Sequence, residues 1–301
     1  MRIGVVIPVY HRPGLILECL ESVASQSRAP EVVIVVDDAS TDDTADRAES
    51  WMRARTDATD WRVLRQAENG GPSRARNRAI GELADCDVIA FLDSDDLWPS
   101  GYLAGAEAQL SAHAEAVAAV RDLHFERTAP GRTSRTRDCS LVARSPMWEF
   151  IRRGAPTPSS VVVRRAALVA NGGFDETVLF AEDLDCYLAL ARDGAWVHVS
   201  GEPIRYRVDI GAERKEAQAM TDLPIDADTG LKIAEIVERF CQKTPPANAR
   251  SLLSLAWFRA GCDAQRAGNW PATRARFLKS LAYQPWNTRA AGRWLCALPR
   301  T

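Results

Sequence analysis

Short apolar runs alternate with amphipathic stretches over the first third of the chain. The runs are rich in β-branched residues and end in turn residues, which is typical of buried strands. They are Ile3–Val9, Glu31–Val36, Trp61–Leu64 and Val88–Leu92. Helical spacing lies between them, in Leu15–Ser25, Thr41–Arg55 and Ser73–Leu83, with Ser40 or Thr41 as the expected N-cap of the second helix. Strands that alternate with helices predict a parallel sheet with helices on both faces.

The middle of the chain is less regular. Residues 126–140 are rich in Arg, Thr and Ser and predict an exposed loop or hairpin tip. Further helices are expected at Met147–Arg153 and Ala181–Asp193, the latter stopped by Gly194. Further strands are expected at Ser160–Val163, with a short helix after it to Ala170, and at Ala195–Val199.

Beyond about residue 225, only helical patterns remain. They cover Ile225–Gln242, Ala249–Arg266, Pro271–Ala282 and Thr288–Leu298. Trp257, Gly268, Trp270 and Pro285 resemble positions of one tetratricopeptide-repeat helix pair, and such repeats need roughly three units to be stable alone. We therefore expect residues 223–301 to form a helical C-terminal domain that packs as a cap on an α/β domain of residues 1–222.

Composition narrows the class of protein. The chain has 301 residues, of which 46% are hydrophobic and 26% charged, as in globular proteins. Its 38 basic and 40 acidic side chains nearly balance, which gives no support for nucleic-acid binding. The seven cysteines contain no C-x-x-C pair, so a zinc site is not indicated and free thiols in a reducing compartment are. No run reaches the ~20 apolar residues of a membrane span, so we expect a cytoplasmic protein. Contact with the inner face of a membrane and self-association stay open.

Three carboxylates end the fourth apolar run, in Phe91-Leu92-Asp93-Ser94-Asp95-Asp96. Carboxylates that follow a buried strand lie in the crevice where open α/β sheets bind ligands. Closely spaced oxygen ligands suit Mg²⁺ or Mn²⁺, which in turn bind phosphate oxygens. The run therefore indicates a nucleotide-diphosphate site, and a solvated acidic turn is the alternative. The Gly-rich dinucleotide fingerprint is absent after the first strand, which disfavours an NAD enzyme.

Several other segments along the chain, taken in order together with this acidic run, form a recognisable pattern. They are Val5–Tyr10, Val33–Asp42, Asn69–Asn77 leading into Phe91–Asp96, and Gly172–Glu176 followed by Phe180–Asp183. Their order and spacing resemble the family 2 glycosyltransferases, inverting enzymes of the GT-A fold, over roughly residues 3–210. The resemblance implies a Rossmann-like nucleotide-diphospho-sugar transferase domain, here with an all-helical C-terminal extension.

The resemblance implies a nucleotide pocket at the ends of the first two strands. Asp38 would accept a hydrogen bond from the base, typically uracil, because an ionised carboxylate is acceptor-only. Asp37 beside it is expected to be structural. Pro8 and Tyr10 would line the base pocket, with core packing as the alternative for Tyr10. Arg76 would either lie over the nucleotide or pair with the acidic run.

The acidic run supplies the implied metal site. Asp95 would bind Mn²⁺ or Mg²⁺ directly, and Asp93 would contact the ribose or a metal-bound water. Ser94 between them is grouped with the nucleotide-binding residues. Relatives often have a histidine where this chain has Asp209, which would ligate the metal in its place or simply be exposed. Arg205 and Arg207, which precede Asp209, are candidates to hold the diphosphate.

Glu182-Asp183 matches the E-D pair of the family at the start of a helix, and Asp183 matches its general base. Ordinary acidic charging of a helix N-terminus is the alternative reading. The processive Q-x-x-R-W pattern does not follow, which favours single addition. Residues 154–160 are expected near the acceptor, and His198 is expected to be structural.

The combined expectation is a metal-dependent inverting glycosyltransferase that moves one sugar from a nucleotide-sugar, with UDP favoured, to a glycan, lipid-linked or protein acceptor. The expected setting is cell-surface polysaccharide synthesis. The alternatives are a catalytically inactive adaptor that acts through the helical tail, and a metal-dependent phosphatase. A phosphatase of the haloacid dehalogenase type would need a downstream lysine motif, and none fits around Lys215. A sugar-phosphate nucleotidyltransferase would need a Gly-rich loop after Val9, which is missing.

Overall fold

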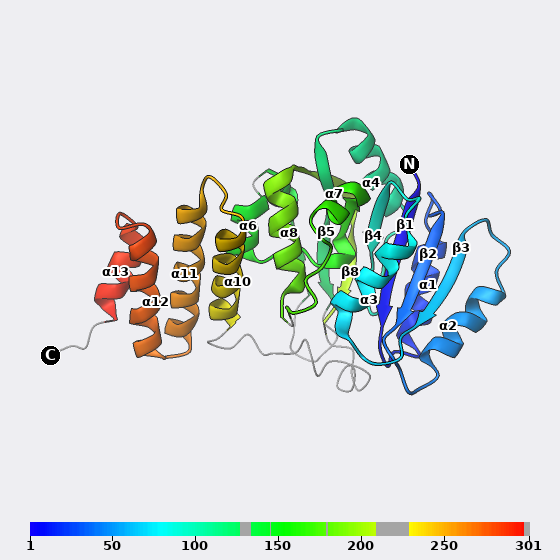
Figure 1. The fold of residues 1–301 in the computed structure, drawn as a ribbon, viewed down its shortest axis with the longest axis horizontal. Coiled ribbons are helices and arrows are strands. Elements are labelled where there is room, and N and C mark those ends of the chain that lie inside the picture. The colour runs from blue at the N-terminus through cyan, green and yellow to red at the C-terminus, as the bar shows by residue number, and fades with distance from the viewer. Residues whose placement is uncertain (127–133, 145, 179, 209–228, 298–301) are drawn as a thin grey trace.

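A computed structural model describes residues 1–126, 134–144, 146–178, 180–208 and 229–297. Its centre is one mixed sheet with the strand order β3-β2-β1-β4-β7-β5-β6, and β8 pairs with β5 outside that path (Figure 1). The first four strands are parallel to one another, as the alternating pattern predicted. They are β1 (Ile3–Val9), β2 (Val32–Asp37), β3 (Asp60–Arg65) and β4 (Val88–Phe91).

Alternate side chains of the central strands enter two separate cores, because successive residues of a strand point to opposite faces. Val5 and Val33, which are register partners, join one core with helices α1 (Leu15–Ala24), α2 (Thr44–Arg53) and α4 (Tyr102–Ala112). Val6 and Ile34 join the other core with α3 (Gly71–Glu82) and α8 (Glu182–Asp193). The continuous apolar runs thus reflect strands that are buried on both faces.

The second half of the sheet reverses direction. Strand β7 (Val161–Arg164) runs antiparallel between β4 and β5 (Ala116–Glu126), while β8 (Ala195–Arg207) runs parallel to β5. The predicted hairpin is present, since β6 (Arg135–Arg137) pairs antiparallel with β5. Short helices connect these strands: α5 (Ser140–Arg144), α6 (Pro146–Arg153), the 3₁₀ turn Pro158–Ser160 and α7 (Arg165–Ala170).

The predicted start of the second helix is wrong. Helix α2 begins at Thr44 with Asp43 as its N-cap, not at Thr41 with Ser40 or Thr41 as cap. Those two side chains instead bind the loop after β1: Ser40 Oγ accepts a hydrogen bond from the His11 N–H (3.0 Å), and Thr41 Oγ1 lies 3.0 Å from His11 Nε2. Their contacts with a neighbouring loop replace the capping role that local sequence suggested.

Four helices form a layer that α6 and α8 separate from the sheet (Figure 1). They are α10 (Thr229–Lys243), α11 (Ala249–Arg266), α12 (Trp270–Tyr283) and α13 (Thr288–Cys296). Val237 and Trp257 belong to the same core cluster as α8, so apolar packing continues from the sheet into this layer. This confirms the α/β class with an all-helical C-terminal part. The boundary expected between residues 222 and 223 lies outside the described residues, and it and the repeat-like pair stay predictions.

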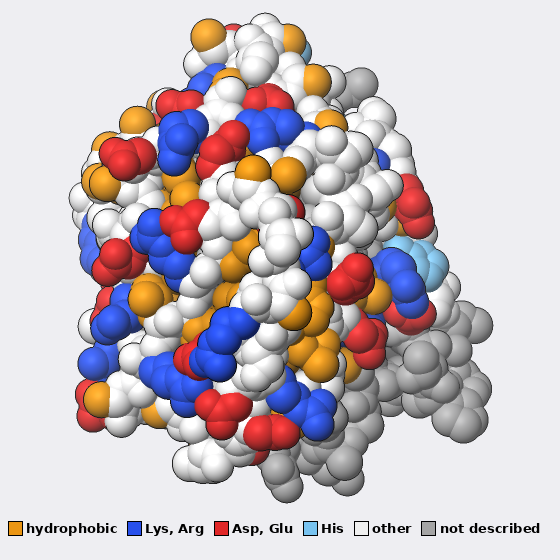
Figure 2. Space-filling model, turned by 90° about the vertical axis from the view of Figure 1, so that its right-hand side faces the viewer, with side chains coloured by type: hydrophobic (Ala, Val, Ile, Leu, Met, Phe, Trp, Pro, Cys, Tyr) orange, Lys and Arg blue, Asp and Glu red, His pale blue; other side chains and the backbone are white. Residues whose placement is uncertain are grey.

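The far end of the molecule, beyond α2 and β3, carries acidic and basic side chains that alternate over the surface (Figure 2). Many of them form ion pairs, including Arg65 with Asp46 and Glu49, and Arg62 with Asp60. Such exposed pairs contribute little to stability, typically about 0–1 kcal/mol each. This end of the molecule therefore has no large surface of a single charge sign.

Two helical glycines of the C-terminal layer should respond oppositely to alanine. A Cβ on Gly261 would lie 2.5 Å from the Phe277 ring, whereas a Cβ on Gly292 would meet no atom within 4 Å. Alanine favours a helix over glycine by about 1 kcal/mol. We expect Gly292→Ala to raise the free energy of unfolding by up to about 1 kcal/mol, and Gly261→Ala to lower it by about 1–3 kcal/mol through overpacking. Urea denaturation of both variants measures this, and a gain for Gly261→Ala would contradict the close helix packing.

Candidate functional site

The candidate residues gather where the carboxyl ends of β1, β2 and β4 meet. Tyr10 follows β1, Asp38 follows β2, and Asp93 follows β4. Backbone bonds hold these ends together, because the Asp38 N–H donates to the Val9 carbonyl (2.9 Å) and the Leu92 N–H to the Val6 carbonyl (3.0 Å). Parallel strands that end together thus bring the separate sequence segments to one edge of the sheet.

The acidic run divides into exposed and buried carboxylates. The side chains of Asp93 and Asp95 are 25% and 20% exposed, whereas Asp96 is fully buried. Asp96 accepts hydrogen bonds from Ser159 Oγ (2.5 Å) and from the Arg207 N–H (3.2 Å). Burial, together with the charges of Asp95 and Asp93, raises the pKa of Asp96 well above its usual range. Asp96 therefore holds the loop together, while Asp93 and Asp95 remain open to a ligand.

Ser159 joins this acidic loop to the segment expected near the acceptor. Its Oγ also accepts a hydrogen bond from the Asp93 N–H (3.1 Å), and its carbonyl accepts one from Trp98 Nε1 (2.7 Å). The side chain is fully buried. The short turn Pro158–Ser160 is thereby fixed against the acidic run. The sequence placed the turn near the site but gave no signal for Ser159.

Arg76 forms a buried bridge across the site. Its Nη2 donates to Asp93 Oδ1 (2.9 Å) and its Nη1 to Glu182 Oε1 (2.8 Å). The guanidinium also lies 5.2 Å from the centre of the Phe174 ring. Burial opposes the charge, but the two carboxylates outweigh it and raise the pKa of Arg76. The pairing with the acidic run is thus present, and the expected position of Arg76 over the nucleotide stays a prediction.

Asp38 organises the loop that leads into α3. Its Oδ1 accepts hydrogen bonds from Gln66 Nε2 (2.5 Å) and the Gly70 N–H (2.9 Å), and its Oδ2 accepts one from the Gly71 N–H (2.8 Å). Burial raises the pKa of Asp38, and these three donors oppose the rise. Because a carboxylate offers about four lone-pair sites, Oδ2 keeps capacity for a further donor. The buried Asp37 accepts a bond from the Ser40 N–H (3.2 Å).

Asp183 begins helix α8 beside Glu182, and the two carboxylates differ in their partners. Glu182 is bound to Arg76, while Asp183 Oδ1 accepts a hydrogen bond from the Leu184 N–H (2.8 Å). Burial is the main cause that raises the pKa of Asp183 to about 7, and the Glu182 charge adds to it against the opposing Arg76. A carboxylate with a pKa near 7 is suited to accept a proton.

Sequence reasoning missed Arg12, which lies beside the acidic run, and His11, which lies beside Tyr10. Buried Arg12 places its Nη2 3.4 Å from Asp95 Oδ2, and its Nη1 has no hydrogen-bond partner among the described residues. The Tyr10 ring stacks on His11 with centres 4.0 Å apart. His11 Nε2 accepts a hydrogen bond from the Thr41 N–H (3.0 Å). The general resemblance covered these positions but assigned them no role.

Left-handed backbone marks the same edge of the sheet. Among the described residues, the non-glycine residues with positive φ are His11 (50°), Ala39 (63°) and Ala181 (50°). They directly follow Tyr10, follow Asp38 and precede Glu182, respectively. Such conformations cost roughly 1–3 kcal/mol each and cluster at functional sites. The backbone is therefore strained at three of the turns that carry candidate residues.

The two predicted arginines at the end of β8 serve different contacts. Arg205 pairs with Glu126 (2.8 Å) on the neighbouring strand. Arg207 donates through Nη1 to Glu18 Oε2 (2.6 Å) and through Nε to the Asp95 carbonyl. Its Nη2 is buried with no partner among the described residues. Arg207 thus supports the acidic loop from behind, and Asp209, the expected metal ligand after it, lies outside the described residues.

The donor set of the acidic loop suits a hard divalent cation. Asp93 and Asp95 offer carboxylate oxygens that remain partly exposed, and oxygen ligands are what Mg²⁺ and Mn²⁺ prefer. A second group of ligating atoms, from Asp122, Asp138 and His198, lies within 4.8 Å elsewhere in the described part of the chain. There His198 Nε2 is 2.8 Å from Asp122 Oδ1, a hydrogen bond that accounts for the position of this histidine.

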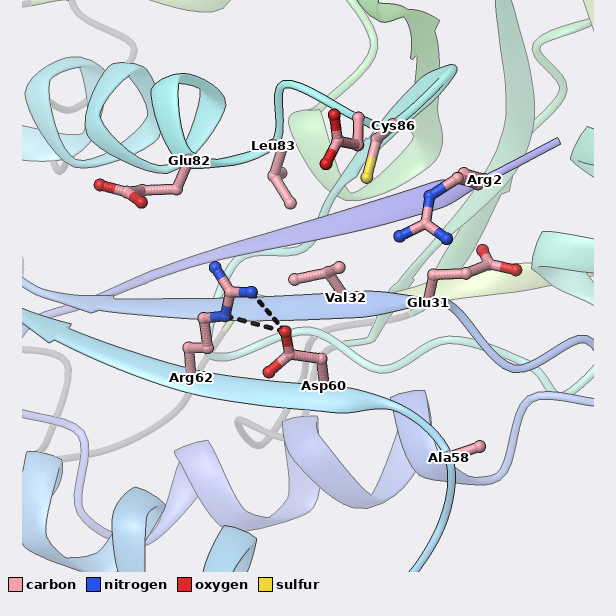
Figure 3. Close-up of a pocket in the computed structure, with 10 residues that line it drawn as sticks. Arg2, Glu31, Val32, Ala58, Asp60, Arg62, Glu82, Leu83 and Cys86 are labelled. Atoms are coloured by element: carbon pink, nitrogen blue, oxygen red, sulfur yellow. Dashed lines mark hydrogen bonds and ion pairs between the residues drawn. The ribbon is translucent and has the colours of Figure 1, made fainter.

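A pocket of about 290 Å³ opens at the opposite edge of the sheet, at the amino ends of β1, β2 and β3 (Figure 3). Its lining mixes both charge signs, with Arg2 and Arg62 facing Glu31 and Asp60. Ligands of parallel α/β sheets bind at the carboxyl ends of the strands, so this pocket is separate from the candidate chemistry. None of the predicted site residues that the structure describes lines it.

Comparisons with solved structures agree with this architecture. Residues 1–349 of TarS from S. aureus, solved with UDP-GlcNAc, match with a TM-score of 0.69 and 19% identity over 99% of this chain and 89% of that chain. The mannosyltransferase PcManGT from Pyrobaculum calidifontis, solved with GDP-Man and Mn²⁺, matches with a TM-score of 0.61 and 21% identity over 98% of this chain and 85% of that chain. These neighbours confirm the GT-A fold. In the described part of the chain, no helix combines the length and the apolar character needed to cross a bilayer.

Sequence comparisons identify the family. The succinoglycan biosynthesis protein ExoU of Rhizobium meliloti is 32% identical over 203 residues, which cover 64% of this chain and 57% of ExoU. ExoW of the same organism is 39% identical over 107 residues, 35% of this chain and 33% of ExoW. The matches thus span less than two thirds of these relatives. The family model described as "Glycosyl transferase family 2" matches residues 4–167, more than half of the chain, and the protein therefore belongs to this family.

Proposed function

We propose that the protein transfers a single sugar from a nucleotide-sugar to an acceptor hydroxyl with inversion at the anomeric carbon. The observation that carries this proposal is the Arg76 bridge, whose two nitrogens bind Asp93 (2.9 Å) and Glu182 (2.8 Å). One guanidinium thereby sets the distance between the acidic loop and the start of α8, where Asp183 lies. Inverting transfer requires that juxtaposition of a diphosphate site and a base.

The donor side is proposed to use Asp38, Asp93 and Asp95. Asp38 Oδ2 would accept the base N–H, with Pro8 and Tyr10 beside it and Ser94 lining the diphosphate. Asp95 and Asp93 would hold Mn²⁺ or Mg²⁺, which, when bound, neutralises the charge that develops on the leaving nucleoside diphosphate. UDP is the favoured nucleotide. The structural neighbours support a nucleotide-sugar donor, since TarS was solved with UDP-GlcNAc and PcManGT with GDP-Man and Mn²⁺.

The acceptor side is proposed to use Asp183 as general base. Its carboxylate would remove the proton of the acceptor hydroxyl while the oxygen attacks the anomeric carbon from the face opposite the diphosphate. The acceptor would lie beside the Ser159 turn and be a glycan, a lipid-linked molecule or a protein. Relatives that are named for succinoglycan biosynthesis support a role in polysaccharide assembly, and we place it at the cytoplasmic side of the membrane.

A thermal-shift panel of UDP, dTDP, GDP, CDP and ADP, each with and without Mn²⁺, tests the donor site. A ligand that binds only the folded state stabilises it by about 2.7 kcal/mol at 100 times its Kd. We expect one diphosphate, UDP first, to raise Tm only when Mn²⁺ is present, and Asp95→Ala to abolish the rise. Asp85→Ala, an exposed carboxylate at the opposite edge of the sheet, is the control and should keep it.

Two outcomes would contradict the proposal. No shift with any nucleotide would favour the inactive adaptor, and Mn²⁺-dependent hydrolysis of a chromogenic phosphate ester would favour the phosphatase. The family match favours neither alternative. A shift that persists in Asp95→Ala would leave a nucleotide site but remove the acidic run from it.

A further inference from the structure

The C-terminal helices carry a strong excess of positive charge. Residues 249–297 contain eight Lys and Arg side chains but one acidic residue, Asp263, within a chain whose net charge is −2. Asp263 is buried and paired with Arg266. Of the other basic side chains, Arg276 is buried and Lys279 pairs with Glu238 of α10 (2.9 Å), so the surface charge comes mainly from the remaining arginines. Arg250, Arg289 and Arg293 are exposed. Charge asymmetry of this kind within one chain indicates an anionic partner.

Helix α12 exposes an apolar line within this basic region. Pro271, Ala275, Leu278 and Ala282 follow one another at steps of four, three and four residues, so they share one face of the helix, and all four are exposed. Arg274 shares that face, since it lies three residues after Pro271 and four before Leu278. We call these four apolar residues the α12 stripe. Leu278 itself is 48% exposed.

Two exposed tryptophans stand just before and just after the α12 stripe along the chain. Trp270, the first residue of α12, is 45% exposed, and Trp286, in the turn after α12, is 73% exposed. Exposed single hydrophobic residues are ordinary on a protein surface, but several of them gathered on one helix and in the turn after it are not. Helices α12 and α13 lie at the end of the molecule farthest from β3 (Figure 1), where the sheet does not cover them.

We propose that the α12 stripe and the arginines around it dock on an anionic lipid surface. Exposed tryptophan and leucine side chains insert at the level of the lipid headgroups, and Lys or Arg side chains beside them attract anionic lipids by about 1 kcal/mol each. Neither signal suffices alone, because stable attachment to a bilayer takes two. The chain supplies both within the same two helices.

The charge and apolar character of this surface favour an anionic bilayer over a second copy of the chain or a nucleic acid. A second copy of the chain on the same stripe would bring two strongly basic surfaces together, which like-charge repulsion opposes. A nucleic acid would satisfy the arginines but would leave the aliphatic part of the stripe exposed to water. A bilayer with anionic headgroups satisfies both the arginines and the apolar side chains.

Flotation of the full chain with lipid vesicles tests the inference without reference to catalysis. We expect binding to phosphatidylcholine vesicles that contain about 30% phosphatidylglycerol, release by about 0.5 M salt, and weak binding to pure phosphatidylcholine. Arg289→Glu should weaken the partition at least about fivefold, because it removes one attractive charge and adds a repulsive one. Arg78→Glu, at an exposed arginine of α3, is the matched control and should bind as the unaltered chain does.

The apolar contribution needs its own pair of variants. Leu278→Ser with Trp286→Ala should weaken binding to anionic vesicles severalfold, while Val169→Ser, at a side chain that is also 48% exposed but lies on α7, should not. Circular dichroism checks that the variants stay folded. Equal binding to neutral and anionic vesicles, or no binding at low salt, would overturn the inference. So would a dimer that Leu278→Ser dissociates, since the stripe would then belong to a second copy.

Discussion

Asp183→Asn is expected to lower kcat/KM for sugar transfer by about 10²–10⁴-fold, the usual contribution of a general base. The amide keeps the shape of the side chain but cannot accept the acceptor proton. Glu182 beside it cannot substitute, because its carboxylate is bound to Arg76 at 2.8 Å. Transfer to the acceptor, measured by release of the nucleoside diphosphate, gives this loss directly.

The pH dependence of the unaltered enzyme should report the same group. The pKa of Asp183 is raised to about 7, and a base must be deprotonated to act. We therefore expect kcat/KM to fall tenfold per pH unit below about 7 and to level off above it. In Asp183→Asn the residual kcat/KM should no longer fall with decreasing pH below about 7. Asp193→Asn, at the other end of α8, is the control and should leave the profile unchanged.

Asp183→Asn should also increase the stability of the folded protein above neutral pH. The pKa of Asp183 in the folded protein lies above its ordinary value, so the favourable contribution of the protonated form is lost as pH rises through about 7. Asparagine has no charge to bury. We expect Asp183→Asn to have a higher Tm than the unaltered chain at pH 8 and the same Tm near pH 4. A lower Tm of Asp183→Asn at pH 8, or full activity with the same fall of kcat/KM below pH 7, would contradict the role of Asp183 as base.

Arg76→Met should lower the free energy of unfolding by about 3–5 kcal/mol, as loss of one partner from a buried ion pair does. The guanidinium is buried, and its removal leaves the carboxylates of Asp93 and Glu182 without their shared counter-charge. Methionine fills the space, so the loss is electrostatic. Denaturant unfolding of the purified variant measures it.

Arg74→Met provides the matched control on the same helix, because Arg74 pairs with Glu68 on the surface and should be removable without measurable effect. The double variant Arg76→Met with Glu182→Gln should recover part of the loss, since one uncompensated charge is then gone. Equal stability of Arg76→Met and Arg74→Met would contradict the bridging role of Arg76.

Parts of the fold were predictable because they depend on local pattern. Strand β1 was predicted with its observed bounds, and β1, β2 and β4 followed from runs that are apolar because both of their faces are buried, whereas the edge strand β3 is partly exposed. Helix α4 and strand β5 were not predicted. Tyr102–Ala112 and the start of β5 are rich in alanine and apolar on several sides, so neither shows a clear helical or alternating period.

The positions of the candidate site residues were predictable, but many of their contacts were not. Asp38, Asp93 and Asp183 stand at the ends of elements that the pattern located, and the structure brings their segments to one edge of the sheet. Their partners were not foreseen: Ser159, Arg12 and the Glu182 side of the Arg76 bridge depend on how distant segments pack. No local rule links Ser159 to Asp96, since the bond spans 63 residues and exists only after β7 has paired with β4.

The contacts of Arg207 also determine when the site can form during folding. Its bond to Glu18 joins residues 189 positions apart, and its backbone bond to Asp96 spans 111. Contacts between such distant positions close large loops and therefore form late. On a ribosome, where domains fold from the N-terminus, the acidic loop is synthesised long before the strand that supports it. Any nascent chain that ends before β8 thus carries Asp93 and Asp95 without their final support, so the site forms only after Arg207 has been synthesised.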